Sequence, residues 1–221
     1  MNYLSVNNLS KYYGDKLLFE NITLFIDKGQ KVALIAKNGS GKSSLLKILQ
    51  GLEPPESGDF KFHKDIKVGF LTQEPAFDDA KSVYQTIMHD ENPILKASFD
   101  YEKALDGHGD LQAAMDKMDE LEAWDYEQQV KLILSKFLIF DLDQKVGSMS
   151  GGQKKRLALA ILLLQQPDLF ILDEPTNHLD MDMIEWLEEY LSKNNITLLM
   201  ITHDRYFLEN ICNEILELEN G

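Results

Sequence analysis

The sequence contains only one cysteine, Cys212, among its 221 residues. A single thiol cannot form a disulfide framework within the chain, and it cannot supply the sulfur ligands of a Cys-rich zinc site. Both kinds of site are therefore excluded. The scarcity of cysteine also agrees with a reducing compartment, and we expect the protein to be cytoplasmic.

Basic residues are scarce as well. The chain has 22 Lys and Arg residues against 37 Asp and Glu residues, which gives a formal net charge of -15 at pH 7. Because contacts to a nucleic-acid backbone need Lys and Arg, this balance argues against broad nucleic-acid binding, although a small basic patch is compatible with it. Ten acidic residues between positions 100 and 127 stand against Lys103 and Lys117, and the simplest interpretation is a solvated helix surface.

Long hydrophobic runs are also lacking. The longest clear one, at 157–164, is far shorter than the ~20 residues that cross a bilayer as a helix. The first residues, Met1-Asn2-Tyr3-Leu4-Ser5, do not have the basic and apolar regions of a secretory signal. We therefore expect no direct membrane insertion.

The two ends of the chain have the apolar patterns of strands. Positions 22–36 alternate and then run apolar, and the residues at 60–70 are expected to form a short hairpin. Between 157 and 202, buried strands and helices alternate, which is typical of a parallel sheet covered on both faces. The expected fold class is therefore α/β.

The middle of the chain differs in character. Positions 82–140 have the apolar spacing of helices, and Gly107-His108-Gly109 interrupts them, which indicates a helical hairpin. We expect a single domain in two parts. They are a core lobe at 1–75 and 155–221, and a helical subdomain with an arm-like hairpin at 76–154.

The first chemical motif is a glycine-rich loop between an apolar strand and a helical stripe. It comprises Ala36, Lys37, Asn38, Gly39, Ser40, Gly41, Lys42 and Ser43, followed by Ser44. In the pattern G-x-x-x-x-G-K-[ST], backbone N–H groups surround phosphates at a helix N-terminus. Lys42 is expected to reach the β- and γ-phosphates of ATP, and the Ser43 hydroxyl to bind Mg²⁺. The pattern departs at Ala36, where alanine is harmless if φ is negative and costly if φ is positive.

Two adjacent carboxylates follow a later apolar strand. Asp173 and Glu174 come directly after Leu169-Phe170-Ile171-Leu172, so we expect them at the sheet edge that carries the glycine loop. We assign Asp173 to Mg²⁺, through water, and Glu174 to the attacking water as its general base. His203 follows another strand, and a histidine at that edge can hydrogen-bond a γ-phosphate or hold the catalytic water.

Three further sites have less distinctive patterns. Gln73 follows the expected hairpin and is assigned to Mg²⁺ or the attacking water, from where it would report the nucleotide state to the helices. Tyr13 is assigned to stacking on adenine, with Tyr12 as the alternative. The segment Ser150-Gly151-Gly152-Gln153 places glycines at a helix start, just upstream of the strand that carries the carboxylates.

The order of these motifs resembles that of ABC-type ATPase domains over nearly the whole chain. The one difference in the Ser-Gly-Gly-Gln signature is Met149, which stands where leucine usually precedes the serine. Asp173 to Asp180, Trp186 to Glu188 and Thr202 to Leu208 are similar to the ABC-F family of soluble, translation-associated ATPases. The resemblance implies a P-loop ATPase fold with a mostly parallel core sheet, an antiparallel N-terminal β subdomain and an inserted helical subdomain.

The resemblance also implies a mechanism. ABC-F proteins carry two ATPase domains joined by a helical linker, and the two domains enclose two ATP molecules head to tail. Ser150, Gly151, Gly152 and Gln153 would then contact the ATP of the partner domain, and Asp180 would couple the two sites at their interface. The partner domain is either the second half of a longer chain, of which this is the N-terminal half, or a second copy. The ribosome is the expected further partner, and weak ATP hydrolysis is expected of the isolated domain.

Two alternatives stay open. The chain could be the ATP-binding subunit of a membrane transporter, which would require separate membrane proteins. It could also be a nucleotide-binding scaffold that has lost turnover, and Ala36 is the only residue that prompts this hypothesis.

Overall fold

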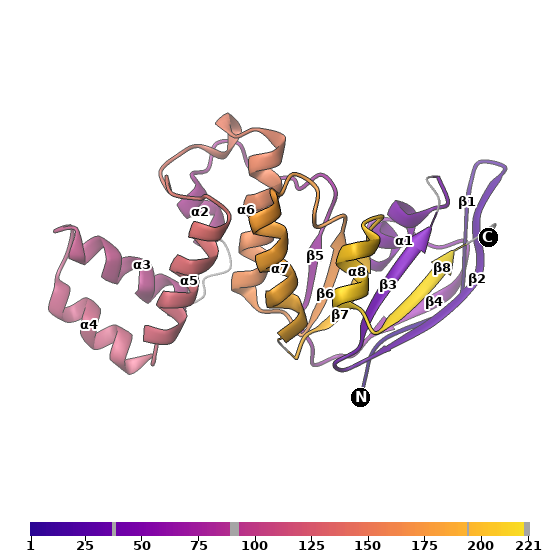
Figure 1. Cartoon of the computed structure of the whole chain (residues 1–221), viewed down its shortest axis with the longest axis horizontal. Coiled ribbons are helices and arrows are strands. Elements are labelled where there is room, and N and C mark those ends of the chain that lie inside the picture. Colours follow the sequence, from indigo (N-terminus) through magenta and orange to yellow (C-terminus); the bar gives the residue numbers. More distant parts are fainter. Residues whose placement is uncertain (37–38, 89–92, 194, 219–221) are drawn as a thin grey trace. The chain divides into compact units, whose positions relative to one another are not determined.

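The computed structural model describes residues 1–36, 39–88, 93–193 and 195–218. They belong to two compact units, one formed by Met1–Gln73 with Gln166–Gly221 and the other by Glu74–Gln165 (Figure 1). The second boundary therefore follows Gln165, whereas the sequence suggested a boundary after Lys154. A hydrogen bond of 2.8 Å from the Tyr126 hydroxyl to the Leu164 carbonyl connects two segments of this second unit.

A five-stranded parallel sheet forms the centre of the first unit. Its order is β5 (Val68–Leu71), β6 (Leu169–Asp173), β7 (Thr197–Ile201), β3 (Lys31–Ala36) and β8 (Glu214–Leu218). All neighbouring pairs are parallel. Every residue of β6 and β7 is buried, which explains why both strands are continuous apolar runs in the sequence. The expected α/β class and parallel core sheet are confirmed.

The first unit also contains three helices, α1 (Lys42–Leu49), α7 (Met181–Lys193) and α8 (Arg205–Ile211). The apolar residues of α1 join those of β3, β6 and β7 in one core cluster. Figure 1 shows α7 and α8 in front of the sheet, and α7 buries Met183, Leu187 and Leu191 at the four-residue spacing of one helix face.

The first unit also contains a three-stranded antiparallel sheet, with the order β2 (Lys16–Asp27), β1 (Asn2–Tyr13) and β4 (Ser57–Phe62). The expected antiparallel N-terminal β subdomain is thereby confirmed. The expected hairpin at 60–70 is wrong, because β4 pairs with β1 and β5 pairs with β6. The two strands lie in different sheets, although the rings of Phe62 and Phe70 still meet edge to face at 6.3 Å.

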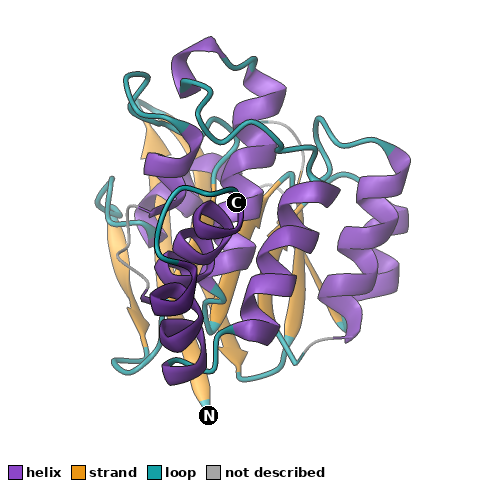
Figure 2. Cartoon of the chain, turned by 90° about the vertical axis from the view of Figure 1, so that its left-hand side faces the viewer, coloured by secondary structure: helices purple, strands orange, loops and turns teal. Residues whose placement is uncertain are grey.

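The second unit is built from helices and the loops that join them (Figure 2). The helices are α2 (Val83–Ile87), α3 (Pro93–Leu105), α4 (Leu111–Glu120), α5 (Trp124–Lys136), the 3-10 turn η2 (Val146–Ser148) and α6 (Gly151–Gln165). The break between α3 and α4 contains Gly107 and Gly109, as the helical hairpin requires. Ala97, Met118 and Ala123 form a small core there, and the rings of Tyr101 and Trp124 pack edge to face at 4.9 Å.

Candidate nucleotide-binding site

A cavity of about 530 Å³ lies in the first unit, beside the carboxyl ends of strands β5, β6 and β7. It is lined by Tyr13, Leu18, Gly39, Gly41, Lys42, Ser43, Ser44, Gln73, Asp173, Glu174, Asn177 and His203. Parallel α/β sheets bind ligands at this edge. The cavity therefore brings together most of the residues that the sequence assigned to ATP, Mg²⁺ and catalysis.

The glycine loop enters this cavity in a conformation that needs glycine. Gly39 has φ +77° and Gly41, which precedes α1, has φ +97°. A Cβ added to Gly41 would lie 2.8 Å from Cδ1 of Phe19 and 2.9 Å from Cβ of Leu18. Glycine is thus required for both backbone conformation and space. The N-terminus of α1 consequently opens on the cavity, with N–H groups suited to an anion.

Ser40 adds a polar group to the loop. Its hydroxyl oxygen is buried and has no hydrogen-bond partner within the part of the chain that the structure describes. A buried polar group without a partner costs free energy, and a phosphate oxygen bound by the loop would remove that cost. Of the loop residues assigned to ATP, Lys37 and Asn38 lie outside the described residues.

The strand pairing of Ala36 bears on the question raised by the missing first glycine. Ala36 ends strand β3 and pairs with Leu218 of β8. Residues paired in a regular parallel ladder have φ near about −120°, a conformation that alanine adopts without strain. The motivation for a scaffold without turnover is weakened accordingly.

Lys42, the first residue of α1, projects its ammonium toward the end of β7. Its Nζ lies 2.8 Å from Nε2 of His203. Burial lowers the pKa of Lys42, and the nearby carboxylates of Glu174 and Asp173 act in the opposite direction. A partly desolvated cation at a helix N-terminus is suited to charge-assisted hydrogen bonds with phosphate oxygens.

Glu174 is held in place by the end of the neighbouring strand. Its Oε2 accepts hydrogen bonds from the Thr202 hydroxyl at 3.2 Å and from the His203 backbone N–H at 3.4 Å. Its own N–H donates to the Ile201 carbonyl at 2.8 Å, and only 12% of its side chain is exposed. Glu174 also has φ +47°, a strained value for a residue other than glycine, of the kind that functional sites hold.

Four further residues that the sequence assigned to the site come from four segments. Asp173 is buried at the end of β6, Gln73 follows β5, and Ser43 lies in the first turn of α1. Tyr13 lines the cavity with 78% of its surface exposed, whereas the alternative, Tyr12, is not among the lining residues. An exposed aromatic ring at the rim leaves a face available for stacking.

Sequence reasoning missed two lining residues, Leu18 and Asn177. Asn177 follows the carboxylates by three positions, and its N–H donates to the Glu174 carbonyl at 3.3 Å. The motif that contains it was recognised, so its position could have been inferred from this spacing. Leu18 lies in β2, and no sequence pattern distinguishes it from the other apolar residues of that strand.

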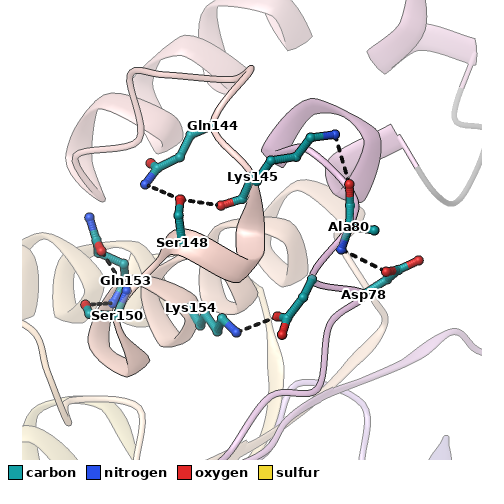
Figure 3. A network of polar contacts seen from close by, with 9 residues as sticks. Asp78, Ala80, Gln144, Lys145, Ser148, Ser150, Gln153 and Lys154 are labelled. Atoms are coloured by element: carbon teal, nitrogen blue, oxygen red, sulfur yellow. Dashed lines mark hydrogen bonds and ion pairs between the residues drawn. The ribbon is translucent and has the colours of Figure 1, made fainter.

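The signature residues Ser150, Gly151, Gly152 and Gln153 belong to the second unit, at the start of α6. The cavity itself is formed by residues of the first unit. The Ser150 N–H donates to Oε1 of Gln153 at 2.8 Å, and the Gln153 N–H donates to the Ser150 hydroxyl at 3.2 Å (Figure 3). This reciprocal capping fixes the first turn of the helix.

Asp180 belongs to the first unit and is not among the residues that line its cavity. It precedes α7, and its Oδ1 accepts the Met183 N–H at 2.9 Å as an N-cap. In the described parts of the chain, no helix is long and apolar enough to span a membrane.

Comparisons with known proteins find relatives over the whole chain. The protein-family model described as "ABC transporter" matches residues 19–177. The chain is 44% identical to "Uncharacterized ABC transporter ATP-binding protein YfmR" of Bacillus subtilis, with 100% of the chain and 37% of the relative covered. It is 35% identical to "Energy-dependent translational throttle protein EttA" of Mycobacterium tuberculosis, covering 98% of the chain and 40% of the relative.

A plant relative and a solved structure extend the comparison. The identity to "ABC transporter F family member 5" of Arabidopsis thaliana is 37%, over 99% of the chain and 34% of the relative. The chain thus spans well under half the length of these curated relatives. A structure described as "Structure of ATP binding subunit of ABC transporter" matches with a TM-score of 0.73 at 24% identity, covering 99% of this chain and 87% of that one. The fold is therefore that of the P-loop ABC ATPases, and the chain belongs to the ABC transporter family of ATP-binding domains, where it resembles the ABC-F members.

Proposed function

We propose that this chain binds and hydrolyses ATP as one ATPase domain of an ABC-F-type protein, and that ATP hydrolysis switches this protein on the ribosome. The observation that carries the proposal is the convergence of Lys42, Glu174 and His203 in one cavity, at the N-terminus of a helix. In this proposal Lys42 and the loop N–H groups bind the phosphates, and Tyr13 stacks on the adenine.

Glu174 is the proposed general base. Its two donors, Thr202 and the His203 N–H, both reach Oε2. Oε1 lies 3.6 Å from Nε2 of His203, so the carboxylate is oriented by β7 on one side and faces the catalytic histidine on the other. A carboxylate held in this way can accept a proton from a water molecule, while His203 hydrogen-bonds the terminal phosphate.

The oxygen atoms of the side chains in the cavity are suitable ligands for Mg²⁺. This ion prefers oxygen ligands and usually combines one or two carboxylates with substrate phosphates. Ser43, Asp173 and Gln73 all line the same cavity and would hold it there. When bound, Mg²⁺ supplies charge neutralisation at the phosphates.

A second ABC domain is the proposed partner. The support is that the signature residues start a helix whose N–H groups can face a γ-phosphate, and that they belong to another compact unit than the residues of the nucleotide cavity. The partner would be the second domain of a longer chain or a head-to-tail second copy. For the isolated domain we expect weak hydrolysis whose rate per chain rises with protein concentration, and a rapid, concentration-independent rate would contradict a composite site.

The ribosomal role is supported by the similarity to EttA, a protein whose name describes an energy-dependent throttle of translation. The test is co-sedimentation of the full-length natural protein with ribosomes, using Glu174→Gln to block hydrolysis. With ATP, the variant should sediment with ribosomes more strongly than without ATP. Glu185→Gln, an exposed change on α7, should behave like the unmodified protein. Equal sedimentation of Glu174→Gln with and without ATP would refute the switch.

The alternative function is the ATP-binding subunit of a membrane transporter, and its support is the name of the Bacillus subtilis relative, which describes an ABC transporter ATP-binding protein. The natural coding sequence distinguishes the two functions. A second ATPase domain downstream in the same reading frame supports the ABC-F proposal. Neighbouring genes for polytopic membrane proteins, without such a domain, support the transporter.

A further inference from the structure

The segment that leads into the signature is fastened to an earlier segment of the same unit. Residues 144–147 lie beside residues 79–83 and share three backbone hydrogen bonds with them. These are Val83 N to Gln144 O at 3.0 Å, Val146 N to Lys81 O at 3.0 Å and Gly147 N to Asp79 O at 3.1 Å. The path of the chain before Ser150 is therefore set by residues 79–83.

Two lysine side chains reinforce this attachment (Figure 3). Lys154 directly follows the signature, and its Nζ lies 2.7 Å from Oδ1 of Asp79. Lys145 donates to the Ala80 carbonyl at 2.9 Å. The same short segment is thus held by one residue before the signature and by one residue after it.

Gly147 shows how closely the two segments approach each other. A Cβ at this position would lie 2.9 Å from Cβ of Asp79 and 2.9 Å from its carbonyl oxygen. Such distances are too short for real Cβ contacts, so any side chain at 147 must displace Asp79. The approach fixes the distance between the backbones, and the Lys154 ion pair fixes the start of α6 against the same residue.

Between these two attachments lies the reciprocal capping of Ser150 and Gln153, which holds the first turn internally. Internal capping gives the turn its shape but does not orient it within the unit. Orientation has to come from contacts outside the turn. Gly147 on one side and Lys154 on the other supply such contacts, and both of them end on Asp79.

We infer that Asp79 and Lys154 form a positioning pair that orients the signature residues toward the nucleotide of the partner domain. Asp79 follows Gln73, a residue of the nucleotide cavity, by only six positions. The pair therefore also connects the segment after Gln73 to the signature helix. This inference rests on the proposed composite ATPase function, and neither residue is assigned to touch ATP.

Charge reversal in the full-length natural protein tests the pair. Lys154→Glu or Asp79→Lys alone replaces attraction by repulsion and should lower kcat roughly five-fold, as expected of a partly exposed ion pair. The affinity for a fluorescent ATP analogue should stay within about two-fold, because the cavity of the first unit is unchanged. The double reversal restores opposite charges and should bring kcat back to within about two-fold of the starting value.

A matched control is available in the same unit. Lys117 and Glu120 form an exposed pair on α4, also at 2.7 Å. Lys117→Glu, Glu120→Lys and the double variant should each leave kcat unchanged. A loss of kcat in this control that equals the loss in Lys154→Glu would overturn the inference, because it would show a general effect of charge.

Hydrogen exchange separates this inference from the proposed function. Amides at 147–154 should exchange faster in each single reversal and recover in the double reversal. Gly147→Ala should accelerate the same amides and lower kcat at constant nucleotide affinity. Unchanged exchange in Lys154→Glu and Gly147→Ala, or a loss that the double reversal does not repair, would overturn the positioning pair. If the variants show these exchange changes but the unmodified natural protein has no ATPase activity, only the proposed function is overturned.

Discussion

The ammonium of Lys42 lies 2.8 Å from Nε2 of His203. In this contact the ammonium is the donor and Nε2 the acceptor. The same nitrogen lies 3.6 Å from Oε1 of Glu174. A phosphate group that enters the cavity therefore meets a cation and a carboxylate that lie on either side of the same histidine nitrogen, and it competes with His203 for the donors of Lys42.

Lys42→Met should weaken ATP binding about 10- to 100-fold, because hydrogen bonds from a charged donor contribute about 1.5–3 kcal/mol. Titration with a fluorescent ATP analogue measures the change. Lys47→Met is the matched control, since Lys47 lies on the same helix but pairs with Glu53 at 3.1 Å. Equal affinities of the two variants would remove Lys42 from the phosphate site.

Gly41→Ala should destabilise the protein more than Gly51→Ala does. Both glycines have positive φ, at +97° and +74°. An added Cβ meets Phe19 and Leu18 at Gly41, whereas it meets nothing within 4 Å at Gly51. Both variants bear a backbone cost of about 1–2 kcal/mol, and Gly41→Ala adds about 1–3 kcal/mol from overpacking. Urea unfolding measures the difference, and equal midpoints would show that the loop relaxes without strain.

Met118→Ala should reduce the stability of the helical hairpin by about 2–4 kcal/mol, since Met118 is fully buried beside Ala97 and Ala123. Met115 lies on the same helix and is 37% exposed, so Met115→Ala should cost less than about 1 kcal/mol. Hydrogen exchange of the α3 and α4 amides measures both values. If the two variants are alike, Met118 is not the centre of this core.

The thiol of Cys212 should react slowly with alkylating reagents. Burial raises the pKa of Cys212 to about 11, and the charge of Lys31 only partly opposes this. A pKa of about 11 in place of the ordinary 9.0 leaves about 100-fold less thiolate at pH 8. Iodoacetamide labelling should thus be about 100-fold slower in the folded protein than in guanidinium. Similar rates in both would show that Cys212 is not shielded. Because it is the only cysteine, the signal is unambiguous.

Much of the fold and the site could be predicted from sequence because the determinants are local. The buried runs of β6 and β7, the glycine loop and the adjacent Asp173 and Glu174 each carry their pattern within a few residues. Parallel strands then end at one edge of the sheet, so the side chains that follow them converge. The convergence of Gln73, Glu174 and His203 in one cavity needed nothing beyond that rule.

What could not be predicted depends on contacts between distant segments. The alternation at 60–70 fits a hairpin, but Phe60 pairs with Val6 and Phe70 pairs with Ile171. No pattern within residues 60–70 predicts which strands they pair with. The position of Leu18 against Gly41 and the approach of Gly147 to Asp79 are tertiary distances of the same kind.

The most direct measurement for the whole account is ATP turnover by Glu174→Gln, together with its affinity for ATP. If Glu174 is the general base for the ATP bound by Lys42, kcat should fall about 100-fold or more, while ATP affinity stays within about three-fold. Glu185→Gln should retain both values. If Glu174→Gln hydrolyses ATP within a few-fold of the rate of the unmodified protein, Glu174 is not the general base.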